Sequence, residues 1–401
     1  MSKMVLAGIV AEYNPFHNGH AYQIAKTRAA GATHIVAVMG GNFLQRGGPA
    51  CAPKLVRANA AIAGGADLVL ELPLPYAAAT AERFAWGALG VLAGLGCVQM
   101  LSFGSECGDL AALSSVAQAI SSPACHAAIK NLLTQGITYA SARQQAITEL
   151  CGAQAAALLA SPNNTLAIEY LRQLSLQKLP IQPFTVQRIG AAHDALTTQN
   201  GLASASYLRE LLHKQPLDAL TPFVPEAVLK IYEQAQKEDL FPFIPHSLDA
   251  ALLSRLRGME RTEFSILPDL SEGLEHRLYE AVRRSTSLEE LLALAKTKRY
   301  PLARLRRLIW SAYLQIPSDM MHLPVPYLRV LAFNQRGVEI FRCASRLTTL
   351  PLSHSLARLE QTDAFCARFA RLEARAADLY ALGLPKILPC GSDYTHKITA
   401  H

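Results

Sequence analysis

The sequence predicts an α/β protein with a doubly wound, parallel, Rossmann-like sheet, followed by a mainly helical C-terminal domain. Four short apolar runs, rich in branched residues and bounded by Gly or Pro, have the character of buried strands. Between them lie segments of helical character that are long enough to cross back over a sheet. From about Pro216 onward, stretches rich in Leu, Arg and Glu recur at helical spacing.

The first half of the chain alternates strand and helix. The predicted strands are residues 5–11, 33–41, 66–73 and 98–106. The predicted helices between them are residues 20–31, 53–65 and 81–96. Crossover connections of this kind make successive strands parallel, and such sheets bind ligands beyond the carboxyl ends of their strands. That rule points to residues 11–20, 40–48 and 103–108.

We predict a domain boundary near residue 216, which separates residues 1–215 from a helical domain of residues 216–401 with breaks near Pro222, Pro245 and Pro324. With 51% hydrophobic and 17% charged residues, the chain can bury a sizeable core. Its net charge of +7 favours a polyanionic partner, although cations scattered over a solvated surface explain the same balance.

Other features bear on compartment and on bound metals. The eight cysteines include no C-x-x-C pair, so neither a zinc site nor a secreted disulfide framework is indicated. The apolar N-terminal stretch lacks a small-residue cleavage site and is broken by Glu12 and Pro15 before it could span a bilayer. We therefore expect a cytoplasmic protein without membrane contact, and no segment indicates a protein partner.

The stretch NPFHNGH, residues 14–20, lies between the first predicted strand and the first predicted helix. If the helix begins near Asn18, its free N–H groups and its dipole favour a phosphate at the end of the strand. His17 and His20 would share one helix face, and an imidazole there can donate to a phosphate oxygen that gains charge during attack on phosphorus. An H-x-x-H pair is also typical of a merely decorated helix end, so the pair alone leaves both interpretations open. No third ligand follows at a metal-site spacing, and we predict no metal site.

The stretch GIVAEYNPFHNGH, residues 8–20, resembles the H-x-G-H signature of the nucleotidyltransferase superfamily, whose members adenylylate a substrate with ATP and release pyrophosphate. A second motif of that superfamily, close to I-S-S-T-x-x-R, brings hydroxyls and an arginine to the phosphates. The segment ASASYLR resembles it through Ser204, Ser206 and Arg209, and lies near Arg188, His193 and Asp194. Two such motifs in the right order favour ATP binding.

Further blocks make the resemblance closer, and it extends over nearly the whole chain. MGGNFLQRGGPA, SFGSE, SPNNTLAIEYL, QRIGAAHDA and KTKRYPLARLRRLIW are similar to segments of the tRNA(Met) cytidine acetate ligases. The resemblance implies a ligase that condenses acetate with ATP into acetyl-adenylate and acetylates the exocyclic amine of the wobble cytidine in elongator tRNA(Met). The products would be N-acetylcytidine, AMP and pyrophosphate, and Mg²⁺ is implied as the companion of ATP.

The same resemblance implies roles for individual residues. The catalytic set is His17, His20, Ser206 and Arg209. The ATP contacts are Ile9, Val10, Ala11, Glu12, Tyr13, Asn14, Pro15, Phe16, His17, Asn18, Gly19, His20, Gly104, Asn163, Arg188 and Ile189, with Asn163 preferred over its neighbour Asn164. The tRNA contacts are Lys298, Arg299, Arg304, Arg306 and Arg307, with Tyr300 and Trp310 interleaved for base stacking and Arg329 and Arg336 as additions. Basic helices are usually solvated faces, and that alternative stays open.

Some positions depart from the family pattern. Gly40, Gly48 and Ala192 stand where relatives carry a hydroxyl, a carboxylate and an aromatic residue, so roles of those side chains are not transferred. Asn42, Gln45 and Arg46 remain as contacts for the acyl substrate or for the anticodon loop. Asp67 and Glu71 on the third predicted strand are either buried structural carboxylates or magnesium ligands, and we favour the former.

Two other functions compete with the ligase. One is a small-molecule adenylyltransferase of cofactor metabolism, which would not need the basic segment around Arg304. The other is a non-catalytic RNA-binding protein with a relic nucleotide pocket, against which the intact His17, His20, Ser204 and Arg209 argue.

Overall fold

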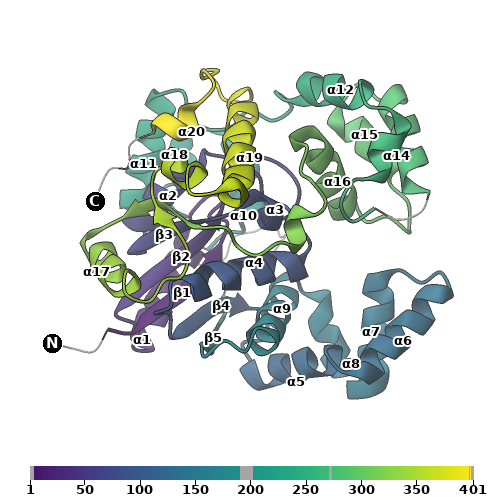
Figure 1. Ribbon diagram of the computed structural model, residues 1–401, viewed down its shortest axis with the longest axis horizontal. Coiled ribbons are helices and arrows are strands. Elements are labelled where there is room, and N and C mark those ends of the chain that lie inside the picture. Colours follow the sequence, from purple (N-terminus) through teal and green to yellow (C-terminus); the bar gives the residue numbers. More distant parts are fainter. Residues whose placement is uncertain (1–3, 190–201, 271–272, 397, 399–401) are drawn as a thin grey trace.

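The computed structural model describes residues 4–189, 202–270, 273–396 and 398, and its centre is one seven-stranded sheet with the strand order β5-β4-β1-β2-β3-β6-β7 (Figure 1). The strands are β1 (Leu6–Ala11), β2 (His34–Gly40), β3 (Leu68–Leu72), β4 (Met100–Ser105), β5 (Gln182–Gln187), β6 (Leu328–Phe333) and β7 (Leu352–Ser353). Strands β1 to β5 pair in parallel, β6 runs antiparallel to β3, and β7 runs parallel to β6. The predicted α/β class and the four predicted strands are confirmed.

Helices cover both faces of the sheet, as a doubly wound topology requires (Figure 1). The helices of the first half are α1 (Asn18–Ala29), α2 (Lys54–Ala63), α3 (Leu74–Ala77), α4 (Ala81–Gly94), α5 (Leu110–Ile120), α6 (Pro123–Thr134), α7 (Tyr139–Cys151), α8 (Ala153–Ala157), η1 (Leu158–Ala160), α9 (Pro162–Leu176) and α10 (Ala205–Lys214). Those that follow are η2 (Leu217–Leu220), α11 (Glu226–Lys237), α12 (Asp249–Arg257), α13 (Arg261–Ser265), α14 (Leu274–Arg284), α15 (Leu288–Ala295), α16 (Leu302–Leu314), η3 (Met320–His322), α17 (Gln335–Ala344), α18 (Leu356–Glu360), α19 (Ala364–Ala381) and α20 (Ser392–Thr395).

Alternate residues of the central strands point into two different cores. In β2, Val36 and Val38 join a core with α4 and α9, whereas Ile35 and Ala37 join a second core with α2 and α11. Because both faces are covered, the strand consists of a continuous apolar run rather than alternating polar and apolar residues. This burial explains why the sequence identified β1 to β4 so clearly.

The sheet also contains strands that the sequence analysis did not predict. β5 is a partly exposed edge strand, QPFTVQ, without the apolar run of a buried strand. β6 is apolar but lies between helical segments, where a short apolar run does not distinguish strand from helix. Since β6 follows residue 216, the sheet takes strands from both sides of the predicted boundary, and the division into two domains stays a prediction.

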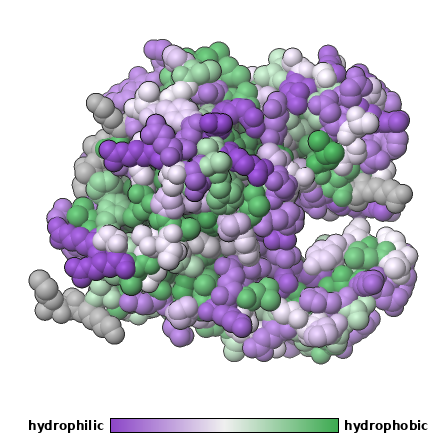
Figure 2. Space-filling model, in the orientation of Figure 1, coloured by the Kyte–Doolittle hydropathy of each residue, from purple (hydrophilic) through white to green (hydrophobic). Residues whose placement is uncertain are grey.

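Two groups of helices extend from the same side of the sheet. Helices α5–α8 form one group and α12–α16 form the other (Figure 1), and Figure 2 shows the surface hollowed between them. Among the described residues, no helix combines the length and the apolar character needed to cross a membrane.

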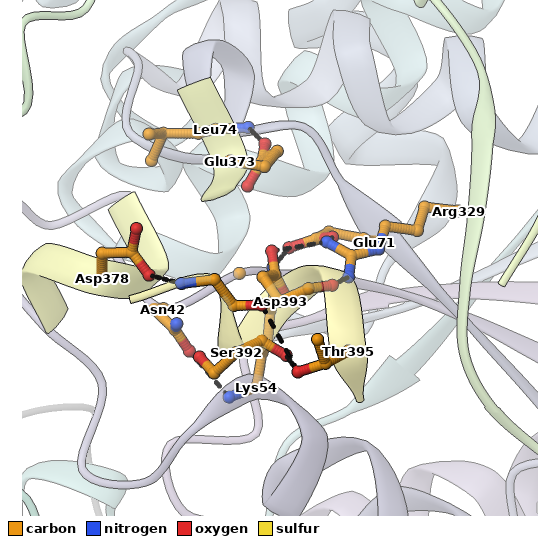
Figure 3. A network of polar contacts seen from close by, with 12 residues as sticks. Asn42, Lys54, Glu71, Leu74, Arg329, Glu373, Asp378, Ser392, Asp393 and Thr395 are labelled. Atoms are coloured by element: carbon orange, nitrogen blue, oxygen red, sulfur yellow. Dashed lines mark hydrogen bonds and ion pairs between the residues drawn. The ribbon is translucent and has the colours of Figure 1, made fainter. Parts of the chain in front are cut away.

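A buried network of charges ties the end of the chain to the sheet (Figure 3). The Lys54 Nζ donates to Glu71 Oε1 at 2.7 Å and to Asp393 Oδ2 at 2.8 Å. The Arg329 guanidinium donates to the same two carboxylates, at 2.9 Å to Glu71 Oε2 and 2.8 Å to Asp393 Oδ1. Two cations and two anions therefore balance one another inside the protein, which is the condition for burying them.

This network shows that one predicted tRNA contact is wrong, and the buried contacts of two carboxylates, one in β3 and one directly before it, show that both are structural. Arg329, expected as a tRNA contact, is only 3% exposed and pairs with Glu71 and Asp393. Glu71 is a buried structural carboxylate, and so is Asp67, which accepts from Arg28 at 2.8 Å and from the backbone N–H of Ile35 at 2.7 Å.

Glu373 of α19 lies beside the network and is also buried. Its Oε1 accepts from the backbone N–H of Leu74. Burial is the main cause that raises the pKa of Glu373 to about 8, and the negative charge of Glu71 is the second. The carboxyl group is therefore protonated at neutral pH, which keeps the charges of the network in balance.

We expect Asp393→Asn to destabilise the protein by about 3–5 kcal/mol, because it leaves the buried Lys54 and Arg329 with one carboxylate between them. Urea unfolding measures this change. Glu226→Gln, which removes an exposed partner of Lys230, is the control and should have little effect. A stability unchanged by Asp393→Asn would contradict the network.

Glu373→Gln tests the protonation state. In the wild type the folded-state pKa is raised, so the contribution of Glu373 to stability is complete below its unfolded pKa and is lost as the pH rises toward about 8. The amide keeps the acceptor for Leu74 but does not titrate. The stability of Glu373→Gln relative to the wild type should thus increase from pH 5 to pH 8 and then level off. A difference independent of pH would show that Glu373 is ionised when folded.

Candidate functional site

A cavity of about 850 Å³ opens at the carboxyl ends of β1, β2 and β4, where a parallel sheet is expected to bind its ligand. All four residues predicted as catalytic, His17, His20, Ser206 and Arg209, line it. A smaller cavity adjoins it and shares His17, His20, Gln23, Gly104 and Arg188 with it. The two motifs, which are far apart in the chain, therefore meet at one place.

The start of α1 is organised by its two histidines. His17 is the N-cap, and its Nδ1 accepts from the backbone N–H of Gly19 at 3.0 Å. His20 Nδ1 accepts in turn from the backbone N–H of His17 at 3.2 Å, and the two rings stack with centroids 3.8 Å apart. The spacing H-x-x-H thus reproduces a capping box with imidazoles in place of the usual hydroxyl and carboxylate.

This arrangement sets the tautomer of both rings. An Nδ1 that accepts a hydrogen bond carries no proton, so each neutral ring carries its proton on Nε2. Burial is the main cause that lowers the pKa of His20 well below its usual range, and the charges of His17 and Arg188 lower it further. At neutral pH His20 is consequently an uncharged Nε2–H donor at the wall of the cavity.

The segment with Ser204, Ser206 and Arg209 is hydrogen-bonded directly to the turn of residues 14–20. Ser204 caps α10 by accepting from the backbone N–H of Tyr207 at 3.1 Å. Arg209 donates through Nη1 to the carbonyl oxygen of Asn14 at 2.8 Å and through Nη2 to Ser206 Oγ at 3.1 Å. The N-termini of α1 and α10, with their partial positive charges, therefore face the same space.

A third helix N-terminus, that of α9, is closed by Glu106. The Glu106 carboxylate accepts from the backbone N–H and the side-chain amide of Asn163, at 3.1 and 2.7 Å, and from the backbone N–H of Asn164 at 2.7 Å. Asn164 Oδ1 accepts from the backbone of residue 106 at 2.9 Å and is buried, whereas Asn163 lines the cavity. Of the two asparagines, Asn163 has the position that a ligand contact needs.

The other residues predicted to bind ATP divide into three sets, two of which line a cavity. Eight line the larger cavity: Val10, Ala11, Glu12, Tyr13, Asn14, Gly104, Asn163 and Arg188. Gly19 and Ile189 line the smaller one.

Four predicted residues line neither cavity: Ile9, Pro15, Phe16 and Asn18. Ile9 belongs to the sheet core, and Phe16 packs so closely on Gly64 that a Cβ there would lie 2.2 Å from its ring. The Asn18 side chain donates to the carbonyl of Pro222 at 3.1 Å. Their contact with ATP therefore stays a prediction that neither cavity supports.

The loop between β2 and α2 forms the other wall. Leu44 to Pro49 line the cavity, and Asn42 accepts from the backbone N–H of Lys54 at 2.8 Å, so the base of this loop adjoins the buried network. Gly47, at φ +77°, lies against α16, where a Cβ would be 2.7 Å from the Cβ of Arg306. Gly48, at φ +143°, has a backbone conformation that strains any larger residue.

The cavity is strongly cationic. Arg46, Arg188, Arg209 and Arg306 line it, and among the described lining residues Glu12 is the single carboxylate. Such a surface suits a polyanion. The described part of the chain contains no group of three or more His, Cys, Asp or Glu side chains arranged to hold a metal ion.

The basic segment before and within α16 presents only some of its predicted tRNA contacts. Lys298 and Arg299 are exposed, and Arg306 reaches the cavity. Arg304 donates to the backbone carbonyl of Asp269 at 2.6 Å, and Arg307 donates to the Asp269 carboxylate at 3.3 Å. Tyr300 and Trp310 are buried, so the expected stacking of RNA bases on these rings is wrong for this structure; Trp310 instead packs on Phe43 in the loop after β2.

The sequence analysis assigned no role to several lining residues, although Phe103 falls within the predicted range 103–108. Phe84, Phe103 and Tyr170 form an apolar wall, and Gln23 lines the cavity together with the histidines. Their helical spacing or strand position is that of core residues, and no sequence signal separates a side chain at the cavity from one in the core. His193, Asp194 and Ala192 lie outside the described residues.

Comparisons with known proteins agree with this geometry. The model of the HIGH Nucleotidyl Transferase family matches residues 4–391. The chain is 36% identical to a tRNA(Met) cytidine acetate ligase of Alkaliphilus metalliredigens over 95% of each chain, and 35% identical to one of Caldanaerobacter subterraneus over 98% of this chain and 99% of the relative.

Solved structures give the same result. The apo crystal structure of Thermotoga maritima TmcAL superposes with a TM-score of 0.93 at 30% identity and covers 99% of this chain and 100% of its own. The same protein bound with alpha-thio ATP superposes with a TM-score of 0.92 at 27% identity and with the same coverage. The chain belongs to the HIGH nucleotidyltransferase family and, within it, to the tRNA(Met) cytidine acetate ligases.

Proposed function

We propose that this protein is an ATP-dependent ligase that activates acetate as acetyl-adenylate and acetylates the exocyclic amine of the wobble cytidine in elongator tRNA(Met). The observation that carries the proposal is the convergence of the 14–20 turn and the 203–209 segment on one cationic cavity. The products are N-acetylcytidine, AMP and pyrophosphate. Because its substrate is tRNA, we expect the protein to act in the cytoplasm.

The triphosphate is proposed to lie across the starts of α1 and α10. There the Nε2–H groups of His17 and His20 and the guanidinium of Arg209 would donate to phosphate oxygens, as the fixed Nδ1 bonds favour. When the acetate oxygen attacks the α-phosphorus, charge builds on these oxygens, and donors that are already oriented stabilise it without reorganisation. The adenosine would extend toward Gly104, Arg188 and Ile189.

Magnesium is expected to arrive with the triphosphate and to be held largely by phosphate oxygens and water. Glu12 is the single carboxylate among the described lining residues and does not form a metal-binding group, so we derive no step from the ion.

The second step needs the amine and the activated carbonyl to be held together. A cytosine amine is a weak nucleophile because its lone pair is delocalised into the ring, so proximity within the cavity supplies much of the rate. The unpaired base would enter between the helix groups α5–α8 and α12–α16, and the exposed Lys298 and Arg299 between α15 and α16 would contact tRNA phosphates. A small-molecule adenylyltransferase would not need such exposed cations.

Replacing His17 or His20 with Ala should slow acetate-dependent exchange of pyrophosphate into ATP by roughly 10²–10³-fold, because each removes one donor to the transition state. Affinity for tRNA should stay nearly unchanged. His213→Ala, at the far end of α10 and outside the cavity, is the control and should exchange like the wild type. Loss of tRNA binding with normal exchange would contradict this division of roles.

Lys298→Glu combined with Arg299→Glu should weaken tRNA binding and reduce the slope of log K against log salt by about 0.7–0.9 for each phosphate that the protein no longer neutralises. We choose these two because they are exposed, whereas Arg306 lines the cavity and Arg307 pairs with Asp269. Acetate-dependent pyrophosphate exchange without tRNA should not change. Lys230→Glu combined with Lys237→Glu on α11 is the matched control with the same change of net charge; an equal loss of binding in that variant would indicate only a general effect of net charge.

A further inference from the structure

The larger cavity contains one feature that the adenylation step does not use. Glu12 follows β1 directly, and among the described residues it is the single carboxylate that lines a cavity otherwise rich in guanidinium groups. A carboxylate there repels a triphosphate, so its side chain is poorly placed to bind ATP. Its position calls for a ligand with hydrogen-bond donors.

The structure holds Glu12 firmly in place. Its Oε1 accepts from the backbone N–H of Gln45 at 3.0 Å, and its backbone carbonyl accepts from Arg57 Nη1 at 2.6 Å. Arg57 itself is completely buried. The carboxylate is therefore fixed between the end of β1 and the loop after β2, at the wall of the larger cavity, where it can contact a ligand.

Glu12 lines the larger cavity and not the smaller one, toward which the adenosine is proposed to extend. The smaller cavity, which contains Gly104, Arg188 and Ile189, does not include it. Glu12 lines only the larger cavity, together with the apolar wall of Phe84, Phe103 and Tyr170. Burial, and then the charge of Glu12, raise the pKa of the Tyr170 phenol, which places that carboxylate near the apolar wall.

An apolar wall beside one carboxylate matches the chemistry of a cytosine ring. The flat faces of the base favour contact with aromatic and aliphatic groups, and its N4 amine is a donor that Glu and Asp accept in nucleic-acid complexes. Neither acetate nor the triphosphate offers such a donor, and the adenosine, whose amine and hydroxyls would, is proposed to lie toward Gly104, Arg188 and Ile189.

We propose that Glu12 accepts a hydrogen bond from the exocyclic amine of the target cytosine and takes the proton from that amine when the acetyl group is transferred. This inference rests on the proposed function. The amine lone pair forms the new C–N bond to the acetyl carbonyl carbon, and the bond between that carbon and the phosphate oxygen breaks. AMP leaves with the electron pair, and the N–H proton passes to the Glu12 carboxylate and then to water.

Glu12→Gln separates the two half-reactions. The amide oxygen can still accept from Gln45 and from the cytosine amine, but the amide cannot take a proton. We expect acetate-dependent exchange of pyrophosphate into ATP, measured without tRNA, to fall far less than acetyl transfer does. Transfer to saturating tRNA in a single turnover should fall by roughly 10²–10⁴-fold, the usual range for loss of a general base.

Further variants separate chemistry from position. Glu12→Ala loses the amine contact as well and should raise the KM for tRNA in addition to lowering the transfer rate, whereas Glu12→Gln should change mainly the rate. Glu82→Gln, in the first turn of α4 beside the cavity but not lining it, is the matched control and should leave both half-reactions unchanged.

Two results would overturn the inference. A parallel loss of pyrophosphate exchange and transfer in Glu12→Gln would assign the carboxylate to ATP or its Mg²⁺, and normal transfer would show that no proton passes to it. A wild-type protein without any acetate-dependent exchange would instead overturn the proposed function, and this inference with it.

Discussion

The site depends on two backbone N–H groups at the start of α1, those of His17 and Gly19, and on the imidazoles that accept from them. An aspartate in these positions would cap the helix equally well but, as a carboxylate, would offer no donor. An imidazole has a second nitrogen, and once Nδ1 is engaged, the proton of the neutral ring lies on Nε2. The hydrogen bonds that cap α1 therefore also orient two Nε2–H donors at the end of β1.

The remaining parts of the fold hold other groups around that pair. Arg209 bonds the carbonyl of Asn14, so α10 is fixed to the same turn. The loop after β2 is anchored at its base by the contact of Asn42 with Lys54, and Lys54 in turn joins Glu71, Asp393 and Arg329 in the buried network. Gly47 lets that loop touch α16, which brings Arg306 to the cavity. Through these contacts the last residues of the chain support a site formed mainly by the first half.

The sequence was informative where burial or capping leaves a local pattern. Strands β1 to β4 are apolar on both faces and were predicted, whereas the edge strand β5 and the isolated strand β6 were not. His17, His20, Ser206 and Arg209 could be assigned to one cavity because their motifs are local, and all four line it. Of the apolar wall, Phe103 fell within the predicted range 103–108, but Phe84 and Tyr170 were missed because distant elements bring them there. Arg329, Tyr300 and Trp310 were assigned to RNA because composition does not distinguish a buried cation or aromatic ring from an exposed one.

The most direct test of this account is a structure of the protein with a non-hydrolysable ATP analogue. The account predicts phosphate oxygens within hydrogen-bond distance of Nε2 of His17 and of His20 and of the guanidinium of Arg209, with the adenosine toward Gly104 and Arg188. Phosphates bound instead beside Glu12 and Arg306, away from the start of α1, would contradict it.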